Sequence, residues 1–176
     1  FSWLSREAGL LLNNVLLVVI LAMILLGTLY PLVADVLGWG KISVGPPYFN
    51  FFFVPLGLLL VLAMGVGSSL QWKRQTSGSL QRLLKAPVLL SPVLAVLWLL
   101  LAGWHLKVAS LLGLAAALWL ILFTLQDIWK KSDHSRGRRI GLRRLKPSYW
   151  GMVIAHLGIA VLAIGITLTS NYSDQR

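Results

Sequence analysis

Few residues in this chain could take part in chemistry, and the histidines are the most versatile of them. The sequence has three histidines, no cysteine and five carboxylates. Without cysteine, a disulfide, a thiolate metal site and a cysteine nucleophile are excluded. The sequence also contains no phosphate-binding loop, no serine-hydrolase elbow and no pair of neighbouring carboxylates suited to acid–base catalysis. The histidines are therefore the first candidates for a functional site.

His156 stands out by its position. It is the only side chain that ionises near neutral pH inside any of the five long apolar segments of the chain. At about 1.5 Å per residue it lies roughly 10 Å from the basic end of its segment. An ionisable group at membrane depth is costly and marks a functional site by default. Two interpretations stay open: a haem ligand, since haem iron commonly takes a neutral imidazole, and a histidine bonded to a carbonyl of a neighbouring helix.

The residues around His156 are small. One helical stripe would let a second helix approach closely, and it consists of Gly151, Ala155, Gly158 and Gly165. The face of His156 itself carries mainly short side chains, namely Met152, Ala160, Ala163 and Thr167. A flat macrocycle ligated by histidine needs such room, so the spacing is compatible with a haem site at His156, but a single histidine does not decide between the two interpretations.

The other polar candidates have simpler explanations. His105 follows Trp104 at a turn between two apolar segments, where a polar interfacial residue is expected. His134 falls in a strongly basic loop and is expected to be solvated. Asn13 and Asn14 lie near one end of the first apolar segment, where asparagines more often join helices than bind ligands.

The elements that must position these residues are membrane helices. Hydrophobic residues make up 57% of the chain and charged residues 12%, whereas about a quarter of a soluble domain is charged. Crossing a bilayer takes roughly 20 apolar residues. We therefore predict an all-α, polytopic transmembrane helix bundle that forms one helical region over residues 1–176. The predicted spans are about 9–30, 49–70, 87–104, 108–126 and 149–170.

The segments between the spans are predicted to be loops. The first loop, residues 31–48, is rich in Gly and Pro, and the second, residues 71–85, is polar and basic. The third, residues 104–107, is a very short turn, and the fourth, residues 127–146, is strongly basic. The chain begins with Phe1 and shows no signal-peptide pattern, so we expect it to be a piece of a longer protein.

Charge sets the expected orientation. If the spans alternate, thirteen of the sixteen Lys and Arg residues fall on the side of the N-terminus. The positive-inside rule then predicts the N-terminus inside and the C-terminus outside. The densest basic loop, residues 130–146, would also suit nucleic acid or anionic lipid head groups. We interpret it as a determinant of topology and expect no nucleic-acid partner.

Several ordered motifs resemble a known family. Near the N-terminal end they are Ser5-Arg6-Glu7, Leu10-Leu11-Leu12-Asn13-Asn14, Gly27-Thr28-Leu29-Tyr30-Pro31 and the stretch from Ile42 to Asn50. Near the C-terminal end they are the stretch from Ser148 to Gly158, Ile164-Gly165-Ile166 and Asn171-Tyr172-Ser173. Together they resemble the CcmF family of cytochrome c-type biogenesis proteins. Between about residues 72 and 146 only the hydropathy pattern agrees.

The resemblance implies a function. Members of that family are multi-pass proteins of the bacterial inner membrane. They act in the haem lyase that attaches haem covalently to apocytochrome c, together with other maturation subunits: a haem chaperone and an apocytochrome-handling subunit. They hold a haem b between transmembrane histidines, and the histidine of the Ala-His-Leu-Gly stretch is one axial ligand. By this resemblance His156 is that ligand, and the chain would contact membrane lipid and apocytochrome c.

The departures from the family pattern limit what this chain could do alone. The tryptophan-rich external segment that presents haem has no counterpart here, and the second axial histidine is expected on a helix outside this chain. We therefore expect the late transmembrane part of such a protein, with half of a haem site and no identified catalytic residue. Enzyme activity would belong to the multi-subunit lyase.

Two alternatives of other classes stay open. A transporter or channel subunit would need a polar path through several spans, and the spans offer only scattered Asn, Ser and Thr beside His156. A structural assembly subunit without cofactor would leave His156 with a hydrogen-bond partner in the protein.

Overall fold

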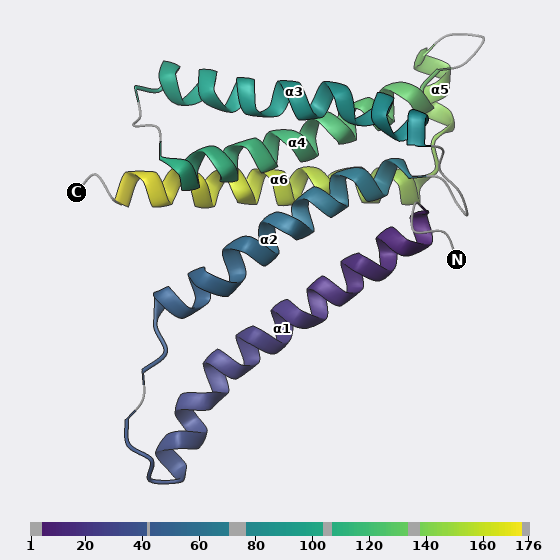
Figure 1. The fold of residues 1–176 in the computed structure, drawn as a ribbon. Helices are drawn as coiled ribbons and strands as arrows, with labels where there is room; N and C mark the ends of the chain where they lie inside the picture. The colour runs from purple at the N-terminus through teal and green to yellow at the C-terminus, as the bar shows by residue number, and fades with distance from the viewer. Residues whose placement is uncertain (1–4, 42, 71–76, 104–106, 134–137, 174–176) are drawn as a thin grey trace.

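The protein folds into helices only, within the part that the structure describes. The structure is a computed structural model that describes residues 5–41, 43–70, 77–103, 107–133 and 138–173 (Figure 1). Its helices are α1 (Arg6–Val36), α2 (Pro46–Ser69), α3 (Ser77–Leu101), α4 (Val108–Lys131), α5 (Arg138–Arg144) and α6 (Pro147–Ser173). All except α5 are long and apolar enough to cross a membrane, which makes five candidate spans in the described ranges. The predicted all-α bundle of about five spanning helices is confirmed.

The long helices alternate in direction. Figure 1 shows the N-terminus, α5 and the first residues of α3 and α6 at one end, and the C-terminus at the opposite end. The basic segment after α4 therefore lies on the same side as the N-terminus, as an alternating set of spans requires. The assignment of that side to the inside of the membrane stays a prediction from the positive-inside rule.

The first helix is longer than predicted. It continues through Pro31 to Val36, so the predicted loop over 31–48 shrinks to the residues before Pro46. A proline removes one backbone donor, and membrane helices tolerate that loss where flanking residues favour the helix. The next helix begins with Pro46 and Pro47, because the first helical positions need no hydrogen-bonded N–H.

Helix structure also extends into the two predicted basic loops. Helix α3 begins at Ser77 rather than near 87, and α4 runs to Lys131, where two lysines in the last turn suit the helix dipole. The backbone N–H of Ser132 then donates to the carbonyl of Ile128 at 2.8 Å. The short helix α5 was not predicted, because a run so rich in arginine carries almost no apolar periodicity.

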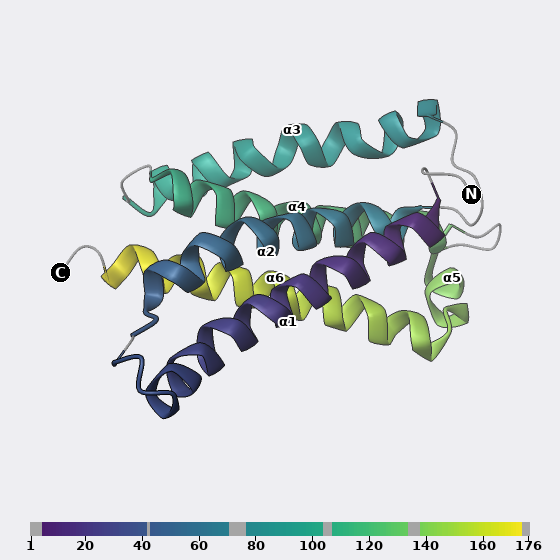
Figure 2. The same ribbon diagram turned by 60° about the horizontal axis from the view of Figure 1, so that its bottom comes forward.

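Helix α4 is the centre of the bundle. It packs against α2, α3 and α6, whereas α1 packs against α2; Figures 1 and 2 both show α4 between α3 and α6. Its buried residues are spaced one to four positions apart and lie on more than one face, as a helix with neighbours on several sides requires; they are Ser110, Leu114, Ala116, Ala117, Leu120, Phe123, Thr124 and Asp127.

Three helix pairs meet at a glycine. A Cβ on Gly27 of α1 would come 2.6 Å from the ring of Tyr48, and one on Gly65 of α2 would come 2.6 Å from the indole of Trp119. A Cβ on Gly113 of α4 would collide with Thr167 of α6. At each glycine a side chain of the neighbouring helix occupies the space that a Cβ would need, as is typical of helices that pack closely in a membrane.

Hydrogen bonds hold two of these three side chains in place. The hydroxyl of Tyr48 donates to the carbonyl of Met23 at 3.1 Å, and Nε1 of Trp119 donates to the carbonyl of Leu62 at 3.3 Å. Thr167 instead donates to Ala163 of its own helix at 2.8 Å, so its buried hydroxyl is satisfied without a partner on α4.

Substituting Gly65 by Val should destabilise the bundle, since the new side chain would enter the space of Trp119. Overpacking of this kind costs about 1–3 kcal/mol. Gly67→Val is the matched control on the same helix, because no described atom lies within 4 Å of its Cβ position. Thermal unfolding of the detergent-purified protein should show a clearly lower midpoint for Gly65→Val than for Gly67→Val. Equal midpoints would contradict the packing described.

Single cysteines in an otherwise cysteine-free version of the intact protein make the orientation testable. Lys41 between α1 and α2 and Lys146 before α6 are both exposed, on opposite sides of the bundle. In spheroplasts, a membrane-impermeant maleimide should label Lys41→Cys and leave Lys146→Cys unlabelled until the membrane is broken. The reverse pattern would place the N-terminus outside.

Candidate functional site

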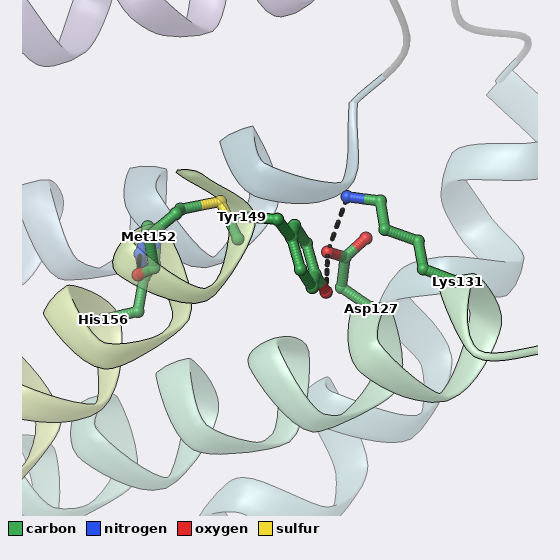
Figure 3. A network of polar contacts seen from close by, with 5 residues as sticks. All are labelled: Asp127, Lys131, Tyr149, Met152 and His156. Carbon is green, nitrogen blue, oxygen red and sulfur yellow. Dashed lines mark hydrogen bonds and ion pairs between the residues drawn. The ribbon is translucent and has the colours of Figure 1, made fainter. Parts of the chain in front are cut away.

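His156 lies in the first half of α6, and one of its ring nitrogens is engaged. Its Nδ1 is 2.8 Å from the carbonyl oxygen of Met152, one turn earlier on the same helix (Figure 3). A carbonyl oxygen only accepts hydrogen bonds, so Nδ1 carries the proton in this bond. In a neutral imidazole the other nitrogen, Nε2, then keeps its lone pair.

This bond is the kind that orients a metal-binding histidine. Histidines that ligate a metal commonly donate their second N–H to a backbone carbonyl or a carboxylate, which fixes the tautomer and the ring direction. The bond in the structure runs to the helix of His156 itself and not to a neighbouring helix. His156 is therefore restrained, while Nε2 can still coordinate iron or accept a hydrogen bond.

On one side of His156 the helix face is more buried than the sequence predicted. Val153, Ala160 and Thr167 are buried at 2%, 0% and 8% exposure, and Thr167 is seated on Gly113 of α4. Ala160 and Thr167 were expected to leave room for a macrocycle, but they serve to pack α6 against α4. Periodicity places residues on one face of a helix and does not tell which part of that face a neighbour covers.

On the other side of His156 the helix face is only half-buried. His156 is half-buried, as are Met152, Ile159 and Ala163, which follow each other along the helix at steps of three or four residues. These positions form a strip beside the contact with α4. A ligand on Nε2 would therefore have to approach over this strip.

The glycine stripe of α6 is not used by the described part of the chain. No described atom lies within 4 Å of a Cβ placed on Gly151, Gly158 or Gly165, and Ala155 is exposed. The close approach of another helix to this stripe stays a prediction.

A polar network joins the beginning of α6 to the end of α4 (Figure 3). Asp127 is only 7% exposed, and its Oδ2 accepts from the hydroxyl of Tyr149 at 2.8 Å and from Nζ of Lys131 at 2.8 Å. The Lys131 ammonium also lies 4.3 Å from the centroid of the Tyr149 ring. The buried charge is thus paired and hydrogen-bonded, as a stable buried carboxylate requires.

Sequence reasoning missed this network. The spacing of Asp127 and Lys131, four residues apart, suggests an ion pair on one helix. Tyr149 is 22 residues from Asp127, and only the packing of α6 on α4 brings its hydroxyl to the carboxylate. A carboxylate directly after an apolar segment, in a chain with five carboxylates, was the available signal.

The remaining predicted candidates are not gathered around His156. Asn13 is half-buried and Asn14 exposed on α1, a helix that packs on α2. His105 and His134 lie outside the described residues. In the described ranges no group of three or more His, Cys, Asp or Glu residues could hold a metal ion.

Comparison with known proteins gives a consistent picture. No family model matches the chain. It is 47% identical over 176 residues to the cytochrome c-type biogenesis protein CcmF of Pseudomonas fluorescens, covering 100% of this chain and 26% of that protein. It is 40% identical over 172 residues to CcmF of Escherichia coli K12, covering 98% of this chain and 26% of the relative.

A solved structure agrees in fold. The structure named cytochrome c heme lyase CcmF matches with a TM-score of 0.69 and 29% identity, over 94% of this chain and 25% of that one. The chain spans about a quarter of the length of the proteins that it matches. Along its whole length the chain is thus a relative of the CcmF cytochrome c-type biogenesis proteins, and the resemblance to that family is confirmed.

Proposed function

We propose that this chain acts in cytochrome c maturation, as a transmembrane part of a haem lyase in the bacterial inner membrane. Within that assembly, His156 supplies one axial ligand to a haem b. The observation that carries the proposal is the hydrogen bond from Nδ1 of His156 to the carbonyl of Met152, which leaves Nε2 as the coordinating atom. The names of the matched relatives support the biological setting.

The residues around His156 fit a haem that is shared with another segment. A neutral imidazole is a common axial ligand of haem iron. His156 lies in an apolar helix, and the strip beside it is half-buried rather than filled by another helix. His156 is also the single histidine among the described residues, so the second axial ligand would come from outside that part of the chain. The haem, when bound, supplies one-electron redox chemistry.

The chain itself contributes orientation and a dry environment. The Met152 carbonyl holds the imidazole ring in one tautomer and one direction. The buried side chains between α4 and α6 keep water away from the helix face next to His156. Axial ligation and burial are the means by which a protein tunes the potential of a haem.

The partners follow from the same proposal. The matched proteins are named for cytochrome c biogenesis and for a heme lyase, so the protein substrate would be apocytochrome c, and other maturation subunits would deliver haem and apocytochrome. The covalent attachment belongs to the whole assembly, of which this chain would provide the membrane part that holds one side of the haem. Membrane lipid would surround the exposed apolar faces of the helices.

Replacing His156 by Gly should remove the haem ligand and leave a gap of imidazole size. In the intact haem-containing protein we expect loss of the low-spin b-type spectrum, with partial recovery when imidazole is added. Ala155→Gly is the matched control, because Ala155 is the exposed neighbour of His156 on the same helix, and it should keep the parent spectrum. Absorption and electron paramagnetic resonance spectra of the purified protein provide the measurement.

Three results separate the possibilities. An unchanged haem spectrum in His156→Gly would exclude ligation by His156. Absence of haem from the intact protein itself would favour a transporter or a structural subunit. Loss of the low-spin signal in Ala155→Gly as well would mean that the change at position 156 acts through general damage to the helix.

A further inference from the structure

Helix α6 is attached to α4 at two points that lie on either side of His156. The first is the hydrogen bond from Tyr149 to Asp127, and the second is the close contact of the Thr167 side chain with Gly113. His156 comes seven residues after Tyr149 and eleven before Thr167. These offsets are close to two and three helical turns, so the three residues lie on one side of the helix.

The two attachments differ in what they restrain. The contact of Thr167 with Gly113 and the apolar contacts of Val153 and Ala160 set the distance between the helices. None of these contacts is a directional bond between the two helices, because the hydroxyl of Thr167 donates within α6. A hydrogen bond to a buried carboxylate is directional and costly to leave unmade.

The carboxylate that accepts this bond is itself held in place. Lys131 lies on the same helix, four residues after Asp127, and its Nζ binds the same Oδ2 atom at 2.8 Å. The Lys131 ammonium also lies over the Tyr149 ring, 4.3 Å from its centroid, where the face of the ring attracts a cation. One cation therefore fixes both the acceptor on α4 and the ring on α6.

Resting on the proposed function, we propose that Asp127 and Tyr149 are positioning residues for His156. Their bond sets the rotation of α6 about its own axis, and with it the direction of the His156 Nε2 atom. Tyr149 is about 10 Å from His156 along the helix at 1.5 Å per residue, so it acts through the helix and not by touching the haem. Without the bond, α6 stays in the bundle but its rotation is less restricted.

The first test measures the haem. In the intact haem-containing protein, Tyr149→Phe should keep the parent haem content while the midpoint potential and the low-spin g-values shift. Tyr30→Phe is the matched control, because Tyr30 is an exposed tyrosine of α1, and it should give the parent values. Parent potential and parent g-values in Tyr149→Phe would overturn the proposal.

A second variant separates the bond from the charge. Asp127→Asn keeps an oxygen that can accept from Tyr149 but loses the attraction to Lys131, so its shift should be smaller than that of Tyr149→Phe. If Tyr149→Phe fails to accumulate, Asp127→Leu, which removes the acceptor of the Tyr149 hydroxyl, decides the question. A potential equal to that of the parent in Asp127→Leu overturns the proposal.

The second test does not depend on haem. A nitroxide label on His156→Cys, in a cysteine-free version of the intact protein, reports the freedom of this position. Adding Tyr149→Phe should increase the mobility of the label, whereas adding Tyr30→Phe should not. Equal mobility in both overturns the positioning role. The two proposals can fail separately. If the label becomes more mobile but the haem spectrum is unchanged in His156→Gly, Tyr149 positions residue 156 and His156 is not a haem ligand.

Discussion

The close approach of helices at glycine is the constraint on which the rest of this structure depends. Lipid is as apolar as leucine, so burying apolar side chains gives little driving force between helices in a membrane, and close packing must supply it. A side chain of a neighbouring helix packs directly against each of three glycines, Gly27, Gly65 and Gly113. They connect α1 to α2, α2 to α4 and α4 to α6 in turn. The position of α6, and of His156 on it, follows from this series of contacts.

Two physical demands meet at α6. The helix must pack tightly on α4, which uses Ala160 and Thr167, and it must present a histidine at membrane depth, which is costly unless the ring is neutral and hydrogen-bonded. The bond to the Met152 carbonyl meets the second demand within the helix itself. The same helix can therefore be tightly packed along one line and open along the strip beside it.

The sequence alone predicted the spans well, and the site only in part. Five apolar segments were enough to predict the bundle, because hydropathy is a strong signal over 20 residues. The ends were missed at Pro31 and Lys131, where helix continues past a proline or into charged residues. His156 was found from its depth, but the role of Ala160 and Thr167 depended on which helix covers them. The bond between Asp127 and Tyr149 depends on tertiary packing, and no local pattern encodes it.

Coordination of haem iron by Nε2 of His156 is the part of the proposed function that can be observed directly. A density map of the intact, haem-containing protein tests it most directly, because the map shows the iron and the ring together. We expect iron at bonding distance from Nε2 of His156, with Nδ1 still bonded to the Met152 carbonyl and the second axial ligand contributed from outside the described part of this chain. A haem whose iron is bound elsewhere, with His156 facing only protein or lipid, would contradict it.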